Sequence, residues 1–291
     1  MRLFAQHVLN GLSVGSLYAL LAIGLSLTYG VLRIIHIAHG GVYMLGGMLS
    51  FTLLVKVEAP PLAAAALTVL ACAAVGLLFE RVAYRPLRGA PIIVTLISSL
   101  GLLLALENLA RILWGPVPQP YPAVIPVRTY TPGGIVVSNL QVLIVAVTLG
   151  LMAAAHWVLR HTSLGLATLA AVQNPRGARL VGIDIDRLAL AIFGAGSGLA
   201  GLAGMLEGLY LGSVDPSMGE MFGLKAFVAV VVGGLGSVVG TILGAYLIGL
   251  LEALTAAYVS AGFRDVITFA LLVVMLMVRP AGLLGRRVDR A

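Results

Sequence analysis

Charged side chains within apolar stretches are the first residues of this sequence that could do chemistry. Glu107, Arg111, Glu207 and Glu252 each lie in an apolar run, where an ionisable group is costly and is expected to be functional. Such carboxylates could relay protons or line a polar path. The i,i+4 spacing of Glu107 and Arg111 favours a local ion pair, and Asn108 between them could extend a polar lining. We expect Glu207 and Glu252 toward helix ends, where side chains reach water, so neither by itself indicates a proton relay.

Two histidines, His36 and His39, have the spacing of metal ligands on one helix face, but no acidic residue or cysteine lies near them in the sequence. We therefore expect their imidazoles to form hydrogen bonds where a helix begins at Gly40. The single cysteine, Cys72, lies in an apolar run, which excludes an internal disulfide and a cysteine metal site. The sequence predicts no metal and no cofactor.

Catalytic motifs are absent from the sequence. No Walker loop ending in Gly-Lys-Ser or Gly-Lys-Thr occurs, and Lys56 and Lys225 are the only lysines. The segment "GSGLAG" has the glycine spacing of a dinucleotide site, but it lies in an apolar helix with no strand before it. The chain is therefore predicted not to be an enzyme and not to hydrolyse ATP by that chemistry.

The composition identifies the elements that must position these residues. The chain is 60% hydrophobic and 10% charged, and its mean hydropathy is +1.07, as in integral membrane proteins. A helix crosses a bilayer with about 20 apolar residues. We predict an all-α polytopic membrane protein, a single transmembrane domain over 1–291 with about eight transmembrane helices. The candidate segments are 8–30, 40–55, 62–79, 92–114, 140–159, 188–211, 223–259 and 265–278.

Basic residues predict the orientation, because loops rich in Lys and Arg stay in the cytoplasm. The net charge of +7 therefore reflects membrane topology and not nucleic-acid binding. The Pro-rich loop 115–139 and the acidic stretch 212–223 are placed outside, so the N-terminus lies outside and the C-terminus inside. Twelve of the 18 basic residues define the inside: Arg33, Arg81, Arg85, Arg88, Arg160, Arg176, Arg179, Arg187, Arg279, Arg286, Arg287 and Arg290.

The long apolar stretch 223–259 complicates this topology, since an odd number of crossings must join Asp215 outside to Arg279 inside. A break in "GGLGSVVG" would make 223–232 a re-entrant half-helix. One long tilted helix, packed through its glycines, is the alternative. The candidate residues of a translocation path or helix break are Asn10, His39, Glu107, Asn108, Gly233, Gly234 and Gly236.

Small residues recur at every fourth position of the predicted helix 188–211. They form a flat stripe on which another helix backbone can lie closely, and we expect it to serve as a subunit or bundle interface. The stripe contains Gly196, Ala200, Gly204 and Gly208.

The stretch "AAVQNPRGARLVGIDIDR" interrupts the apolar chain within a predicted cytoplasmic loop over 160–187. Asn174 suits a helix N-cap, Pro175 the first helical position and Gly182 a left-handed stop, which predicts a two-turn helix. Asp186 is expected to cap the next membrane helix. Because so short a helix is unstable alone in water, the membrane domain or a partner must hold it.

The two predicted faces of this short helix differ. Arg176 and Arg179 share one face, whereas Ala178 and Val181 share the other. The segment "GARLVG" resembles the tail of the Glu-Ala-Ala-x-x-x-Gly coupling motif by which ABC importer permeases dock on their ATPases. Ala178 and Gly182 match that motif, whereas Arg176 and Gly177 replace its Glu and first Ala.

Longer stretches extend the resemblance over nearly the whole chain. "NGLSVGSLYALLAIG", "IAHGGVYMLGG", "ERVAYRPLR", "GIDIDR", "GLKAFVAVVVGGLGS" and "FALLVVMLMVRPAGLLGR" resemble the LivH-type permease subunit of branched-chain amino acid ABC importers. The resemblance implies the ABC importer permease fold, alternating access and a multi-pass protein of the bacterial inner membrane. It also implies an ATPase-coupling role for Asn174, Pro175, Arg176, Ala178, Arg179, Val181 and Gly182.

The partners implied by the resemblance are a second, LivM-type permease, two ABC ATPase subunits and an extracytoplasmic substrate-binding protein. Related importers carry urea or short amides, which is the alternative within this class. An ion-coupled secondary transporter or channel is the rival class. A buried carboxylate at mid-membrane without a docking loop would favour that rival.

Overall fold

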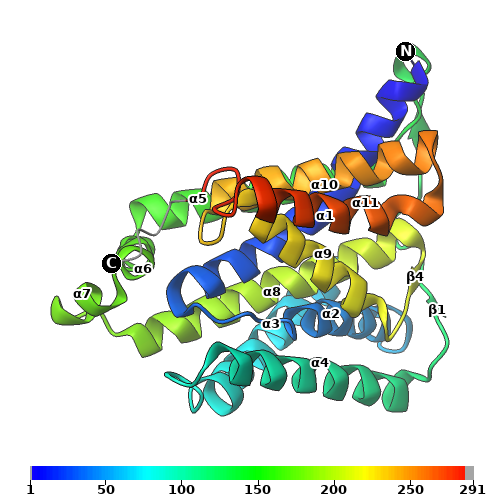
Figure 1. Cartoon of the computed structure of the whole chain (residues 1–291). Helices are drawn as coiled ribbons and strands as arrows, with labels where there is room; N and C mark the ends of the chain where they lie inside the picture. Colours follow the sequence, from blue (N-terminus) through cyan, green and yellow to red (C-terminus); the bar gives the residue numbers. More distant parts are fainter. Residues whose placement is uncertain (1, 286–291) are drawn as a thin grey trace.

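A computed structural model describes residues 2–285 as a bundle of helices (Figure 1). The basic residues Arg286, Arg287 and Arg290 lie outside the described residues. The α-helices are α1 (Arg2–Leu32), α2 (His39–Val55), α3 (Pro61–Phe79), α4 (Ile92–Trp114), α5 (Asn139–His161), α6 (Ser163–Gln173), α7 (Pro175–Leu180), α8 (Ile185–Leu211), α9 (Met218–Gly233), α10 (Val238–Tyr258) and α11 (Arg264–Val278). A π-helical turn, η1 (Glu80–Tyr84), extends α3, and two single 3-10 turns are η2 (Pro132–Gly134) and η3 (Ala261–Phe263).

Within residues 2–285, seven helices are long and apolar enough to cross a membrane: α1, α3 with η1, α4, α5, α8, α10 and η3 with α11. The prediction of a polytopic all-α membrane protein is confirmed. Two shorter helices, α2 and α9, run beside them. Two small antiparallel pairings join the loops at one end of the bundle, β1 (Gln119–Pro120) with β4 (Ser213–Val214) and β2 (Thr129–Tyr130) with β3 (Val137–Ser138).

The bundle has two distinct ends, called here the α7 end and the β1 end (Figure 1). The first turns of α1 lie at the β1 end, where the side chain of Gln6 donates to the carbonyl of Val136. The last turns of α1 lie at the α7 end, where a Cβ on Gly236 would be 3.5 Å from Cα of Gly30. The connection between α9 and α10 is therefore at the α7 end.

The stretch 223–259 consists of two helices and not of one long helix. α9 ends at Gly233 and α10 begins at Val238. Between them, Gly234 and Gly236 have φ angles of 113° and 81°, which a residue with a Cβ rarely adopts. α9 and α10 then lie against each other, because Gly244 packs on the backbone of Ala229.

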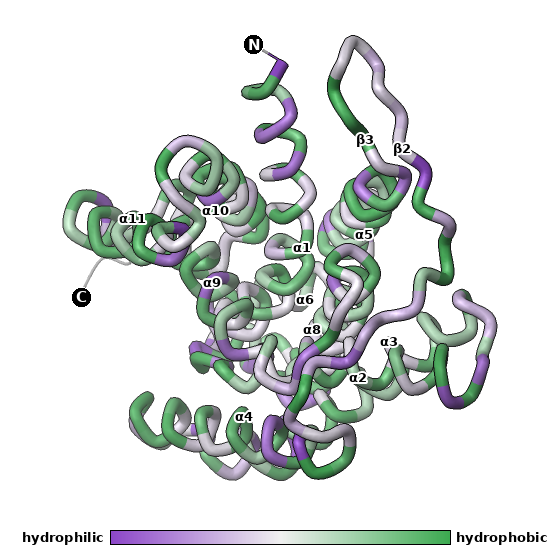
Figure 2. Tube along the Cα trace, turned by 90° about the vertical axis from the view of Figure 1, so that its right-hand side faces the viewer, coloured by the Kyte–Doolittle hydropathy of each residue, from purple (hydrophilic) through white to green (hydrophobic). Residues whose placement is uncertain are grey.

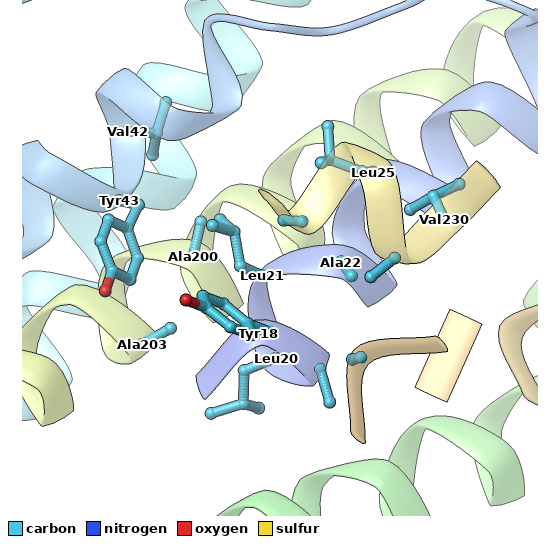
Figure 3. Close-up of a cluster of buried hydrophobic side chains, with 14 of the residues drawn as sticks. Tyr18, Leu20, Leu21, Ala22, Leu25, Val42, Tyr43, Ala200, Ala203 and Val230 are labelled. Atoms are coloured by element: carbon cyan, nitrogen blue, oxygen red, sulfur yellow. The ribbon is translucent and has the colours of Figure 1, made fainter. Parts of the chain in front are cut away.

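The centre of the bundle is built from α1, α2, α8 and α9, while α3, α4, α5 and α11 lie at the periphery with many apolar residues (Figure 2). Tyr18 of α1 and Tyr43 of α2 both pack on Phe222 of α9, with ring centroids 5.2 and 5.3 Å apart. Figure 3 shows these tyrosines grouped with Ala200 and Ala203 of α8. The central helices thus share one core.

The small-residue stripe of α8 is occupied inside the chain. Gly196 meets the backbone of Gly24 in α1, and Gly204 meets the backbone of Tyr43 in α2. All four stripe residues are buried: Gly196, Ala200, Gly204 and Gly208. The expectation that this stripe serves a subunit interface is therefore wrong, because helices of the same chain cover it; the bundle alternative holds.

This packing predicts opposite effects of one substitution at two helical glycines. Gly204→Ala should destabilise the chain by about 1–3 kcal/mol, since its Cβ would meet the Tyr43 carbonyl and force the backbones apart. At Gly101 of α4, no described atom lies within 4 Å of the added Cβ. Gly101→Ala should thus leave stability unchanged or raise it by up to about 1 kcal/mol through helix propensity. Thermal unfolding in detergent measures both, and equal midpoints for the two variants would contradict the close contact.

Candidate functional site

The short helix α7 forms the tip of the α7 end. Asn174 caps it, because its Oδ1 accepts a hydrogen bond of 2.9 Å from the amide of Gly177. Pro175 occupies the first turn, and Gly182 follows the helix with a φ of 87°. Asn174, Pro175 and Gly182 therefore start and end α7 as predicted.

The orientation of α7 differs from the prediction. Ala178 is 4% exposed and belongs to an apolar cluster with Val31, Ala171 and Ile185. Val181 is instead 77% exposed. Ala178 and Val181 thus do not share a free face, because the next residues turn away after the helix ends. Ala178 anchors α7 to its own chain and is not available to a partner.

The exposed surface of α7 combines basic and large apolar side chains. Leu180 is 89% exposed beside Val181, and Arg176 and Arg179 are exposed as well. Large apolar groups projecting from the end of the molecule are typical of a surface that a partner covers. We call Arg176, Arg179, Leu180 and Val181 the α7 tip.

The aspartate that caps α8 is not the one predicted. Asp184, and not Asp186, caps α8, and its Oδ1 accepts from the amides of Asp186 and Arg187 at 3.0 and 3.1 Å. These amides, first that of Arg187, hold the pKa of the Asp184 carboxyl below its usual value. The expected cap by Asp186 is wrong because that side chain turns to two arginines of another segment.

Asp186 pairs with Arg85 and Arg88, and Arg88 also pairs with Glu80. Glu80 is 1% exposed, so its charge depends on Arg88. We call these four residues the Asp186 clamp. It joins the segment after α7 to the turn between α3 and α4, which connects the two separate motifs "ERVAYRPLR" and "GIDIDR".

The predicted path residues on α4 point in different directions. Glu107 is 3% exposed and faces the bundle, and its Oε1 has no hydrogen-bond partner among the described residues. Arg111 lies 3.9 Å from the other oxygen of Glu107. Asn108 is exposed on the outer face and bonds to the Leu104 carbonyl. An exposed amide and guanidinium near the end of a membrane helix can face a protein partner or reach the membrane surface.

The other predicted path residues do not meet at one site. Asn10 accepts a hydrogen bond of 2.9 Å from Gln141 near the β1 end. His39 is 1% exposed and lies against the backbone of Gly24, where a Cβ would be 2.6 Å from its Nε2. Gly233, Gly234 and Gly236 form the turn between α9 and α10 at the opposite end. These positions stay predictions about the path.

The histidine pair is only partly as expected. Nδ1 of His36 lies 2.7 Å from the Tyr84 hydroxyl, which donates to Ser99 at 2.9 Å. Ser99 in turn accepts from the amide of Ala38 just before α2. His36 therefore fixes the turn before α2. His39 has no hydrogen-bond partner in the described chain.

A buried ionic network is the main feature that sequence reasoning missed. Lys225 lies 2.9 Å from Glu252 and 2.8 Å from Asp265. Glu252 also accepts from the hydroxyls of Tyr18 and Thr268. The network joins α1, α9, α10 and α11. A lysine within a long apolar stretch was the available signal, because a charge there needs a partner.

The expectation that Glu207 and Glu252 reach water from helix ends is wrong. Glu207 is 2% and Glu252 is 5% exposed. Both lie within two turns of the ends of their helices, but neighbouring helices cover their side chains.

Comparison with known proteins identifies similar chains. A family model described as "Branched-chain amino acid transport system / permease component" matches residues 7–276. The chain is 37% identical to the high-affinity branched-chain amino acid transport system permease protein BraD of Pseudomonas aeruginosa, covering 97% of this chain and 96% of the relative.

The chain is 36% identical to the LivH permease protein of Escherichia coli K12, with the same coverage. A probable LivH protein of Methanocaldococcus jannaschii is 28% identical over 96% of this chain and 92% of the relative. No solved structure matches.

The Asp186 clamp predicts that Arg88 stabilises the fold through Glu80. Arg88→Gln should lower stability by about 3 kcal/mol, because it leaves the buried Glu80 charge without its partner. Adding Glu80→Gln should recover part of that loss by removing the charge. Arg81→Gln, an exposed neighbour, should have little effect. Thermal unfolding in detergent compares the four proteins, and no recovery in the double variant would contradict the pairing.

Proposed function

Because the chain belongs to the family of branched-chain amino acid transport permeases, we propose that it carries branched-chain amino acids as one permease subunit of an ATP-driven importer. The observation that supports this most directly is the α7 tip. It presents large apolar and basic side chains outside the bundle, while the chain has no ATPase motif of its own. In an ATP-driven importer a partner must supply the ATP hydrolysis, and the α7 tip offers a surface for that contact.

We infer that an ABC ATPase subunit binds the α7 tip. Leu180 and Val181 would supply the apolar centre of the contact, and Arg176 and Arg179 its rim, as in typical protein interfaces. Asn174, Pro175, Ala178 and Gly182 would act indirectly, since they start, anchor and stop the helix. Two ATPases, a second permease of the LivM type and an external binding protein complete the proposed importer.

The polar face of α4 is our candidate for the seam with the second permease. Asn108 and Arg111 are exposed there, in a helix otherwise rich in apolar side chains. Ionisable groups in membrane helices usually face protein or a water-filled cavity. A translocation path along this seam would place Glu107 directly behind it.

An ion-coupled secondary transporter is the weaker interpretation. Glu252 is a buried carboxylate, but Lys225 pairs with it directly, which favours a structural role. The exposed apolar side chains of the α7 tip also favour a protein partner at this end of the bundle, which an importer with ATPase subunits supplies. Both observations support the importer.

The docking proposal predicts that a charge at the α7 tip uncouples the protein. Leu180→Asp should reduce ATPase association by at least tenfold, because an unpaired carboxylate would enter an apolar contact, a cost of more than about 1.4 kcal/mol. Insertion and pairing with the second permease should be unchanged. Co-purification of the ATPase subunits in detergent and uptake in ATP-loaded vesicles measure the effect.

Tyr130→Asp is the matched control, because Tyr130 is also an exposed large side chain, 55% exposed, but lies at the β1 end. It should retain the ATPases. If Leu180→Asp also retains them with normal uptake, α7 is not the docking element.

We also propose an orientation in the membrane. The α7 end is cytoplasmic and the β1 end is external, as the arginine distribution predicts. In a Cys72→Ser background, Arg128→Cys and Arg176→Cys should react with an impermeant thiol reagent from opposite sides of the membrane. Intact right-side-out and inside-out vesicles make the measurement. Reaction of both positions from one side would disprove the orientation.

A further inference from the structure

A cavity of about 760 Å³ opens at the α7 end between segments that are distant in the sequence. Its lining residues come from the last turns of α1 and α5, from α6, from the turn between α9 and α10 with the first turn of α10, and from Leu284. Figure 1 shows where these helices lie. It is separate from the α7 tip and from the polar face of α4. Its size lies within the range of about 300–1,000 Å³ that is typical of small-molecule sites.

The charged groups lining the cavity are all basic. Arg33 comes from the end of α1, and His156 and Arg160 come from the end of α5. The lining contains no Asp or Glu among the described residues, and neither arginine forms an ion pair in this part of the chain. Two guanidinium groups without a counterion around one cavity favour an anionic ligand.

The rest of the lining is largely apolar. Leu159, Leu169, Val172, Val238 and Val239 contribute to it, and Val239 is 49% exposed. A ligand that fits this cavity therefore has an anionic group joined to an apolar portion.

The cavity also lies at the level where membrane meets water. Arg160 and His161 are in the last turn of α5, and Trp157, one turn before, is 59% exposed. Basic residues and tryptophan at the end of a membrane helix mark the headgroup region. Lipid headgroups are thus available at this depth.

The backbone at Arg33 has an unusual conformation. Arg33 has a φ of 54°, in the left-handed region that residues with a Cβ rarely adopt. Arg33 directly follows the end of α1, and its amide donates to the Tyr29 carbonyl at 2.8 Å, as is common for a left-handed residue at a helix C-terminus. This conformation turns the chain from α1 toward the segment before α2, with Arg33 at the cavity.

We propose that this cavity binds the headgroup of an anionic phospholipid, with the phosphate held by Arg33 and Arg160. An amino acid in transit also has an anionic and an apolar part, but its ammonium group would need a carboxylate, and the lining offers none. The headgroup of an anionic phospholipid such as phosphatidylglycerol has no ammonium group, and the acyl chains of the lipid match the apolar wall. Basic pockets between membrane helices are known to suit anionic lipids.

The test measures lipid binding to the full-length chain purified in mild detergent. Native mass spectrometry with added phosphatidylglycerol or phosphatidylcholine of equal chain length should show preferential binding of phosphatidylglycerol. Arg33→Gln with Arg160→Gln should weaken that preference by roughly tenfold or more, since each basic residue near a lipid surface contributes. Leu169→Trp, which fills the cavity without changing charge, should weaken it too.

Arg81→Gln with Arg128→Gln is the matched control, because it removes two exposed basic residues that do not line the cavity, and it should bind like the unaltered chain. Equal loss in the control and cavity variants would overturn the proposal. Full displacement of the lipid by glycerol 3-phosphate alone would assign the site to a soluble anion instead. A third outcome would combine unchanged lipid binding in Leu169→Trp with crosslinking of Leu169→Cys to an ATPase subunit in the importer. This outcome would show that a protein partner, and not a lipid, occupies the cavity.

Discussion

Close approach of helix backbones is the constraint on which the rest of this structure depends. α1 and α8 meet at Gly24 and Gly196, where a Cβ on Gly24 would lie 2.9 Å from the facing Cα. α2 and α9 meet at Gly40 and Gly219, each against the carbonyl of the other. In a membrane, helix association relies on such packing because lipid is as apolar as the side chains. The glycines thus set the spacing of the four central helices.

Close packing also explains where the polar groups lie. Where two helix backbones touch at glycines, no side chain fits between them. The large side chains of Tyr18, Tyr43 and Phe222 therefore pack together beside the glycine contacts. Lys225 and Glu252 neutralise each other next to this layer. A buried pair of this kind is costly to break by removing one partner. The core therefore holds α1, α9 and α10 in one arrangement.

The sequence predicted the elements well but not the directions of their side chains. Apolar runs and glycine or proline signals were sufficient for the membrane helices, for α7 and for the separation of α9 from α10, because these depend on local chemistry. The faces of α7 and the cap of α8 were wrong, since Ala178 turns inward and Asp186 turns to Arg85 and Arg88. The network around Lys225 was missed. All these features depend on contacts between residues far apart in the chain.

The contacts of α7 and of the segment after it connect the α7 tip to the rest of the bundle. Ala178 packs with Ile185 and Leu188 of α8, and α8 is bound to α1 and α2 through its glycines. Through Asp186, the same segment is tied to Arg85 and Arg88, directly before α4. The outer side of α4 is uncovered, and Gly101 there has no described neighbour within 4 Å of an added Cβ. A partner bound to α7 would therefore bear on the central helices through Ala178 and on the segment before α4 through Asp186.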